Sequence, residues 1–555
     1  MRIETPAGEP AETTAGSGTA ARTAVTPAEP RPDAPRGSAV PSTRLDRRFA
    51  AWVRTPRGRR LWFVGAPLAI VLLAALVRFW NLGHPQSLVF DETYYVKDAW
   101  TLANNGYESA WPEGADERFA AGETDIFRAD PSYVVHPPLG KWIIAAGMGI
   151  FGPESAFAWR ATTALLGTLA VPLLMLITRR LLGSHLLALL AGLLFAIDGH
   201  AIVMSRVAIL DNSVMFFALL GFGAIMLDRE SFARRLTERV AAARLAGREP
   251  EWGPAIWARP WLVAAGLAFG ATTAVKWSGL YFLAAFGLYT VIADAVLRRQ
   301  LELPAWFSGA VVRQGPVSFL LLVPVAAVTY LASWSGWLLS RGGYFRDWAE
   351  QDGNAWTGPF AFVPRAIQSL IHYHESAYGY HVRLSSPHGY QANPLGWTIL
   401  QRPTSMYYVE SKGCFGGVCS SAITAIGNPL IWWAGTAAVL VLLYLAVRHM
   451  DGRYALILMG LVAGYLPWWA YTNRTVFQFY SIAFEPYILL ALVAVAGYLL
   501  GRPDDPEIRR QRGLWIVGGY VALALLLSAF WYPLWTGTAV PKFFWQMHNW
   551  FITWV

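Results

Sequence analysis

The sequence predicts an all-α protein that crosses a membrane many times. Of its 555 residues, 55% are hydrophobic and only 15% are charged, against about 25% charged residues in typical soluble proteins. Its mean hydropathy is +0.35. The 27 Trp, 23 Tyr and 29 Phe residues suit a chain with much of its surface at the membrane–water boundary, where aromatic rings collect.

Apolar stretches separated by charged or polar segments predict eleven membrane-spanning helices. A helix needs about 20 mainly apolar residues to cross a bilayer. The expected spans lie near residues 61–80, 156–178, 183–198, 207–227, 261–275, 277–296, 316–338, 429–447, 454–471, 480–500 and 514–532.

The distribution of basic residues predicts a cytoplasmic N-terminus and an extracytoplasmic C-terminus. Arg is concentrated in residues 44–60, before the first span, and cytoplasmic loops carry an excess of Lys and Arg. Alternating from there, the Arg-rich segments 228–259 and 502–512 also face the cytoplasm. Because these charges lie between apolar runs, the net charge of +9 indicates contact with anionic lipid and excludes nucleic-acid binding. The first span is expected to act as an uncleaved signal-anchor.

Composition divides the chain into four expected parts. Residues 1–43 are rich in Ala, Pro, Thr and Gly and predict a disordered cytoplasmic tail. Residues 44–338 form an N-terminal transmembrane module, whose first outside loop, 81–155, carries the candidate catalytic acids. Residues 339–428 form a large extracytoplasmic loop, and residues 429–555 form C-terminal transmembrane helices with an interfacial tail.

An adjacent acid pair, Asp91 and Glu92, begins eleven residues after Trp80, the last residue of the first expected span. Two close carboxylates raise the pKa of one of them, as a base working near neutral pH requires. The aromatic residues around the pair include Tyr95. We interpret the two acids as a general base and an orienting partner at the membrane surface; the alternative is a solvated interfacial pair.

A second motif runs His136-Pro137-Pro138-Leu139-Gly140-Lys141, just before the short apolar run 143–151. Two prolines favour an extended entry into a helix, and this one is expected to lie along the interface. Lys141 either binds a phosphate or reaches toward lipid headgroups.

Four cations lie near expected span ends on the same side as Asp91, where the positive-inside bias disfavours them. They are Arg160, Arg206, Lys276 and Arg474. Ionisable groups at membrane depth are functional or paired, so these cations either bind a lipid-linked phosphate or form structural ion pairs, such as Arg206 with Asp211.

The large outside loop contains both cysteines and a group of histidines. Cys414 and Cys419 are separated by Phe-Gly-Gly-Val, which allows a small disulfide-closed loop in an oxidising compartment. A metal knuckle is the alternative. These histidines are His372, His374, His381 and His388, and Glu375 lies among them. The His-x-His-Glu run fits a metal site by residue type, although hydrogen-bonding histidines are commoner in loops.

Taken together, Asp91-Glu92, the His-Pro-Pro motif, Arg206-Val-Ala-Ile-Leu-Asp211 and Lys276-Trp-Ser-Gly resemble the protein O-mannosyltransferase family of GT-C membrane glycosyltransferases. The resemblance covers the chain from the first span onward, in the same order. The second outside loop is too short for the β-trefoil MIR domain of eukaryotic members, and the Arg-rich, Ala-rich composition resembles an actinobacterial member.

The resemblance implies a polyprenyl monophosphate mannose donor and a Ser or Thr hydroxyl acceptor on an exported polypeptide. Asp91 would deprotonate that hydroxyl in an inverting transfer, with Glu92 placing acceptor or base. The candidate donor-phosphate ligands are Arg160, Lys276, Arg206 and Arg474, and the candidate substrate-binding residues are His136, Lys141, Tyr95 and Asp211.

The topology predicted from the basic residues places the site on the extracytoplasmic face, and the protein is expected in the plasma membrane with membrane lipid as a partner. No metal ligand is assigned. Whether the enzyme uses a divalent cation is left open, and so is whether a secretion channel delivers the acceptor. Two other functions stay open as well: another GT-C transferase acting on lipid or glycan, and a transporter or flippase of a polyprenyl-linked sugar. The flippase is disfavoured because the acid pair lies at an outer surface and no inverted repeat is visible.

Overall fold

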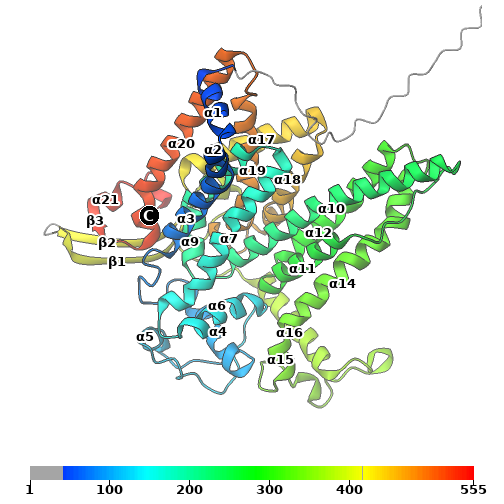
Figure 1. Cartoon of the computed structure of the whole chain (residues 1–555). Helices are drawn as coiled ribbons and strands as arrows, with labels where there is room; N and C mark the ends of the chain where they lie inside the picture. The colour runs from blue at the N-terminus through cyan, green and yellow to red at the C-terminus, as the bar shows by residue number, and fades with distance from the viewer. Residues whose placement is uncertain (1–41, 415–416, 555) are drawn as a thin grey trace, which may run out of the picture. The chain divides into compact units, whose positions relative to one another are not determined.

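The computed structural model describes residues 42–414 and 417–554. The predicted disordered tail, 1–43, lies outside the described residues except for its last two. Within the described part, helices dominate and one small sheet is added (Figure 1).

Within residues 42–414 and 417–554, eight helices are long and apolar enough to cross a membrane. They include runs in which a short helix continues into a longer one, as α2 (Pro56–Arg60), η1 (Leu61–Gly65) and α3 (Ala66–Phe79) do at the first span. The others are α7 (Ala156–Leu182), α10 (Asp211–Leu245), α12 (Gly279–Gln300), α13 (Trp306–Ser308) with η2 (Gly309–Gln314) and α14 (Gly315–Ser333), α17 (Pro429–His449), α18 (Gly452–Gly464) with η6 (Leu466–Tyr471), and α20 (Glu507–Thr536).

Three of the eleven predicted spans fall on shorter apolar helices, which are not among these eight. The 183–198 prediction falls on α8 (His185–Ile197), which meets α9 (Gly199–Arg206) at a 59° bend and counts as a ninth span only if the pair is taken together. The bend arises at Asp198, whose extended backbone ends α8 and whose carboxylate caps α9 by accepting from the N–H of His200. The 261–275 and 480–500 predictions fall on helices of 16 residues, α11 (Pro260–Val275) and α19 (Glu485–Leu500).

The remaining helices lie outside these spans. An amphipathic helix, α1 (Arg44–Arg54), precedes the first span and is N-capped by Thr43. The short apolar run after the His-Pro-Pro motif forms α6 (Leu139–Phe151). The others are α4 (Glu92–Asn105), α5 (Ala115–Ala120), α15 (Ser335–Leu339), η3 (Trp348–Glu350), η4 (Gly358–Phe360), α16 (Arg365–Arg383), η5 (Pro394–Ile399), η7 (Gln478–Ala483), α21 (Lys542–Gln546) and η8 (Ile552–Trp554).

A three-stranded antiparallel sheet corrects the all-α prediction. Strands β1 (Thr404–Cys414) and β2 (Gly417–Ala425) form a hairpin, and β3 (Val540–Pro541) adds to the edge of β2. The strand sequences are rich in Val, Tyr, Thr and Ile, which favour a pleated, half-buried surface. The predicted large loop 339–428 therefore contains a helix, α16, and most of a sheet.

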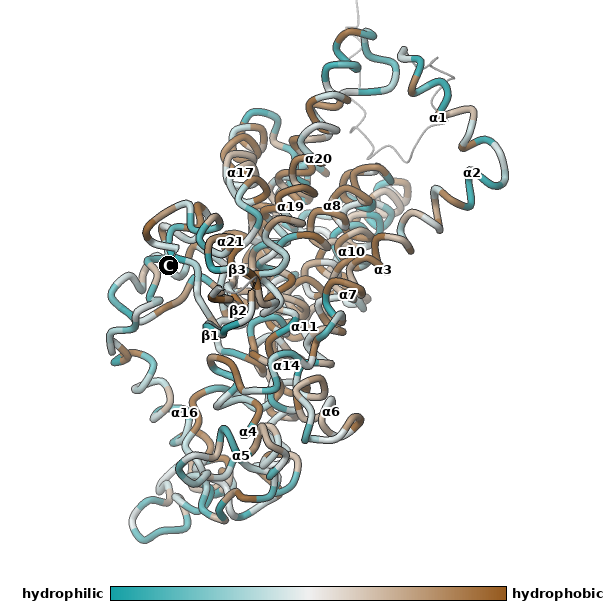
Figure 2. The backbone as a smooth tube through the Cα atoms, turned by 90° about the vertical axis from the view of Figure 1, so that its left-hand side faces the viewer, coloured by the Kyte–Doolittle hydropathy of each residue, from teal (hydrophilic) through white to brown (hydrophobic). Residues whose placement is uncertain are grey.

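The hydrophobic residues follow the helices that cross the membrane, and the polar ones follow the connecting segments (Figure 2). On α3, Leu68, Leu72 and Leu76 recur every fourth residue and are more than half exposed, which places one apolar stripe outward, as lipid contact requires. Its other face packs against α7 and α8.

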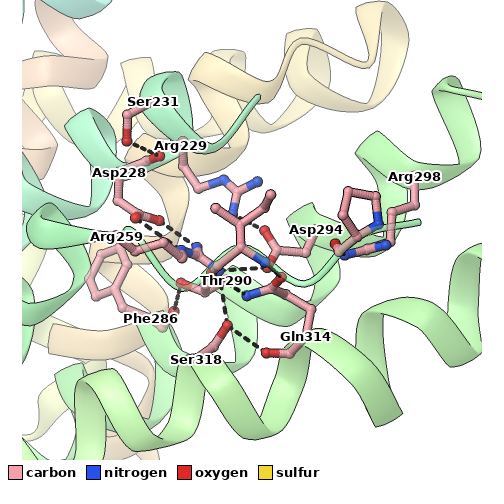
Figure 3. Close-up of polar contacts among 12 residues, drawn as sticks. Asp228, Arg229, Ser231, Arg259, Phe286, Thr290, Asp294, Arg298, Gln314 and Ser318 are labelled. Atoms are coloured by element: carbon pink, nitrogen blue, oxygen red, sulfur yellow. Dashed lines mark hydrogen bonds and ion pairs between the residues drawn. The ribbon is translucent and has the colours of Figure 1, made fainter. Parts of the chain in front are cut away.

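A buried ionic network ties α10, α11, α12 and α14 together away from the acid pair (Figure 3). Arg259, just before α11, donates to Asp228 of α10 at 2.5 and 3.1 Å and to Asp294 of α12 at 2.9 Å. It also donates to the hydroxyl of Ser318 on α14 at 2.9 Å. Because the guanidinium and both carboxylates are at most 1% exposed, the network fixes four helices against one another.

The opposite ends of α10 and α11, together with the ends of neighbouring helices, position the candidate site. The C-terminal ends of α9 and α11 and the N-terminal ends of α4, α7 and α10 carry most of the predicted acids and cations. The connecting helices α4, α5, α6, α15 and α16 gather on that side, at the bottom of Figure 1.

Candidate active site

Asp91 occupies the N-cap position of α4, directly after Phe90, whose φ is +50°. A positive φ is costly for an aromatic residue, and such backbone strain clusters at functional sites. Among the described residues, the Asp91 carboxylate has no hydrogen-bond partner, and it does not cap its own helix. Burial raises the pKa of Asp91 to about 6, Lys276 opposes the rise and Asp211 adds to it. An unbonded carboxylate with this pKa has the properties of a general base.

Glu92, the neighbouring acid, is fully buried and fully bonded. Its two oxygens accept two hydrogen bonds of 2.8 Å from Arg160. They also accept from the backbone N–H groups of Val89, at 2.9 Å, and Ala208, at 2.8 Å. Glu92 therefore ties the loop before α4 to α7 and to the segment before α10, and it leaves Asp91 as the carboxylate open to a substrate.

The guanidinium groups of Arg160 and Arg206 are occupied by the protein itself. Besides Glu92, Arg160 donates to the carbonyls of Leu82, Pro85 and Ser87 at 2.9–3.2 Å. Arg206 donates to the carbonyls of four residues at 2.7–3.4 Å, where α3 ends: Val77, Arg78, Trp80 and Asn81. These contacts hold the loop between α3 and α4 in place. Arg206 makes no ion pair with Asp211, contrary to the pairing considered from the sequence.

Asp211 instead pairs with Lys276, across 65 residues of sequence. The Lys276 ammonium donates to both oxygens of Asp211, at 3.0 and 3.1 Å, and lies 3.8 Å from the centre of the Tyr480 ring. Asp211 begins α10 and Lys276 follows the last residue of α11. The pair therefore fixes a cation beside Asp91, with an aromatic face beneath it.

His136, Tyr95 and Arg474 lie around the same cluster. The ring of His136 is 6.1 Å from that of Tyr95 and 5.2 Å from that of His381. Burial lowers the pKa of His136 well below its usual value, and Lys276 and Arg474 lower it further, so the ring is neutral at pH 7. Burial likewise raises the pKa of Tyr95 well above 10, and Asp91 adds to the rise.

Lys141 lies apart from this arrangement. It forms a buried ion pair with Glu108 and donates to the carbonyl of His136 at 3.1 Å. The nearby Asp98 was not predicted: burial raises its pKa to about 7, and Lys141 opposes the rise. Lys141 thus supports the turn that carries His136.

The structure joins Cys414 and Cys419 in a disulfide at the end of the β1–β2 hairpin. The loop histidines do not form a cluster with metal-ligand geometry: His372 stacks on Trp348, and His374 bonds to Tyr330 at 2.5 Å. Within residues 42–414 and 417–554, no group of three or more His, Cys, Asp or Glu side chains could hold a metal ion.

Two residues of the site were missed from the sequence. Tyr480, beneath Lys276, lies in a run of aromatic residues that resembles the start of a membrane span. His381 was seen only as a loop histidine, yet it accepts a hydrogen bond from Arg474 at 3.0 Å. No local pattern marks either residue, because their partners lie about 200 and 90 positions away in sequence.

Comparison with known proteins identifies the family. Residues 68–332 match the family described as dolichyl-phosphate-mannose-protein mannosyltransferase, and residues 366–554 match the C-terminal four-transmembrane region of protein O-mannosyltransferases. The polyprenol-phosphate-mannose–protein mannosyltransferases of Mycolicibacterium smegmatis strain MKD8 and Mycobacterium tuberculosis strain H37Rv are each 34% identical over 87% of this chain, and the match covers 92% and 90% of their own lengths. The Corynebacterium glutamicum protein of that name is 30% identical over 88% of this chain and 92% of its own.

The fold has a solved relative. The S. cerevisiae protein O-mannosyltransferase Pmt1–Pmt2 complex bound to the sugar donor superposes with a TM-score of 0.66, at 14% identity, over 93% of this chain and 95% of that one. Fold and site therefore define a multi-pass membrane glycosyltransferase. The chain belongs to the dolichyl-phosphate-mannose-protein mannosyltransferase family.

Proposed function

We propose that this protein transfers mannose from polyprenyl monophosphate mannose to Ser or Thr hydroxyls of exported polypeptides, with Asp91 as the base. The observation that carries the proposal is the unbonded Asp91 carboxylate, with its raised pKa, in the field of Lys276. The names of the relatives supply the donor and the protein acceptor.

The proposed step is a single displacement. Asp91 removes the proton from the acceptor hydroxyl, and the hydroxyl oxygen attacks C1 of mannose. The bond between C1 and the phosphate oxygen breaks on the opposite face, so the configuration at C1 inverts. Polyprenyl phosphate leaves as an anion that nearby cations stabilise. A phosphate leaving group needs no separate acid to protonate it, unlike the leaving group of a two-carboxylate glycosidase.

The hydrogen bonds of the four cations indicate two different roles for them. Lys276 and Arg474 bind the donor phosphate, because both border the Asp91 cluster and Arg474 has a buried Nε atom without a partner. Arg160 and Arg206 are positioning residues, because carbonyls and Glu92 occupy their donors. Tyr95 and His136 line the substrate space, Asp211 orients Lys276, and Lys141 supports the His136 turn.

An apolar cavity is the proposed binding site for the lipid tail of the donor. Its volume is about 710 Å³, and it lies among α11, α12, α14 and α16. Trp277, the residue after Lys276, is part of its wall, together with Leu280, Leu283, Val323 and Leu331. A polyprenyl chain seated there would present its phosphate to Lys276 at the membrane boundary.

We place the site on the extracytoplasmic face of the plasma membrane, with the N-terminus in the cytoplasm. The Arg-rich stretch before the first span supports this orientation, and so does the disulfide between Cys414 and Cys419. The acceptor then meets the enzyme as it is exported, and a secretion channel is its proposed source.

The test is mannose transfer by the purified full chain in lipid nanodiscs, from polyprenyl phosphate [³H]mannose to a Thr- and Pro-rich peptide. Wild type should label the peptide with the inverted anomer, and Asp91→Asn should lose at least 100-fold in rate, as loss of a general base does. Asp130→Asn, an exposed acid of the same loop, is the matched control and should keep full activity. Labelled lipid or glycan without labelled peptide would indicate the other transferase function, and sugar transport without transfer would indicate the flippase.

A further inference from the structure

Helix α16, from the large outside loop, is bonded to the segment that leads into His136. The hydroxyl of Tyr373 accepts from the N–H of Val134 at 3.1 Å and donates to the carbonyl of the same residue at 2.6 Å. One turn further on, Ser376 and Tyr133 share a hydrogen bond of 3.0 Å. The helix is therefore held in register against the site rather than lying free over it.

The contacts of His381, near the end of α16, determine its tautomer. Its Nε2 lies 3.0 Å from the carbonyl of Val135, and a carbonyl only accepts, so Nε2 carries the proton. The ring is neutral, because burial lowers the pKa of His381 to about 4; the hydrogen bond to Val135 opposes the fall, and Arg474 and Lys276 contribute to it. Nδ1 therefore has a free lone pair, and it accepts from Nη2 of Arg474 at 3.0 Å.

Arg474 has no other side-chain hydrogen bond and no carboxylate partner within the described residues. Its Nε is buried without a partner, while its charge acts on His136, Lys276 and Tyr480. A guanidinium beside a catalytic cluster, bonded only to a neutral ring, keeps its positive charge and most of its N–H groups for an anion.

We propose that His381 is a positioning residue for donor binding: its Nε2–H tautomer, fixed by the Val135 carbonyl, holds the Arg474 guanidinium toward the donor phosphate. The inference rests on the proposed function and adds a residue and a role to it. An aspartate or glutamate at this place would orient Arg474 equally well but would neutralise its charge. A neutral histidine orients the cation and leaves the charge available.

Two substitutions at position 381 separate this role from simple packing. His381→Gln keeps one acceptor for Arg474 and one donor for the Val135 carbonyl, whereas His381→Phe keeps a ring of similar size and removes both. We expect His381→Phe to raise the donor KM about tenfold or more with a smaller change in kcat, because hydrogen bonds to charged groups are the strong ones. His381→Gln should stay within about threefold of wild type.

The matched control is His372→Phe, the same change on the same helix. His372 is nine residues from His381, so it lies on the opposite side of α16. Its ring stacks on Trp348, with ring centroids 4.0 Å apart. It should leave the donor KM unchanged. Adding His381→Phe to Arg474→Ala should cost nothing beyond Arg474→Ala alone, because His381 acts through Arg474.

Direct binding of polyprenyl phosphate, without the sugar, separates the two proposals. If wild type binds this probe and His381→Phe and Arg474→Ala lose affinity equally, the positioning role holds even if mannose transfer to peptide fails. An unchanged donor KM in His381→Phe overturns the inference. So do losses that multiply in the double variant, or failure of His381→Gln to restore binding in a folded protein.

Discussion

Arg160 binds Glu92 through two parallel hydrogen bonds, each 2.8 Å long, between side chains that are at most 1% exposed. The pair connects the first turn of α4 with the N-terminal part of α7, so it fixes the position of Asp91, the N-cap residue of α4, relative to α7. Of the two adjacent acids, one thus builds the site and the other is free to react.

Removing one member of this pair should destabilise the protein. Arg160→Lys and Glu92→Gln each leave buried groups unmatched, at a cost of about 3–5 kcal/mol in the free energy of unfolding. Thermal unfolding in nanodiscs measures the effect. Arg180→Lys, in the exposed pair with Glu230, is the control and should cost about 0–1 kcal/mol. A Glu92→Gln protein that unfolds like wild type but transfers no mannose would give Glu92 a chemical role instead.

The pH dependence of transfer should show the raised pKa of Asp91. Below pH 6 the carboxyl group carries its proton and cannot act as a base, so kcat/KM should rise as pH increases through about 6. Since Lys276 lowers this pKa, Lys276→Met should move the rise to higher pH. Initial rates between pH 5 and 8 test both statements. A rise that persists unchanged in the residual activity of Asp91→Asn would assign it to another group.

Much of the helical architecture could be predicted from the sequence, because a membrane requires long apolar runs. The bend at Asp198 and the shortness of α11 and α19 could not, since they depend on capping and on packing against neighbours. The hairpin, in contrast, is indicated by the sequence: two strand-like runs rich in β-branched and aromatic residues flank Gly-Gly.

The residues of the candidate site could be predicted from the sequence, but which of them pair with one another could not. Asp91 and Lys276 stood out because ionisable groups are rare at span ends. That Arg160 binds Glu92 rather than a free phosphate depends on two positions 68 residues apart that meet only in the folded chain. The same applies to Arg474 and His381, and to the Lys276–Asp211 pair, which the structure forms in place of the Arg206–Asp211 pair that the sequence left open as an alternative.

The Arg259 network on the other side of the membrane domain should matter for stability and not for chemistry. Arg259→Met leaves the carboxylates of Asp228 and Asp294 buried with less compensation, which should lower the free energy of unfolding by about 3–5 kcal/mol. Arg229 still pairs with Asp294, so Asp228 should carry most of the cost. At a temperature where the variant is folded, its donor KM should match wild type. A raised donor KM with normal thermal stability would contradict a structural role.

A double substitution can separate the two roles of Lys276. Lys276→Met should both weaken donor binding and destabilise the fold, because it leaves Asp211, 5% exposed in its side chain, without its counter-charge. Replacing both members, as Lys276→Met with Asp211→Leu, removes the unpaired charge, so thermal stability should recover to near the wild-type value. Donor affinity should not recover, because the cation that we propose binds the phosphate is still missing. Measured together, unfolding and polyprenyl phosphate binding therefore respond differently to the second substitution. Recovery of both would mean that Lys276 serves only to neutralise Asp211, and the phosphate would then depend on Arg474 alone.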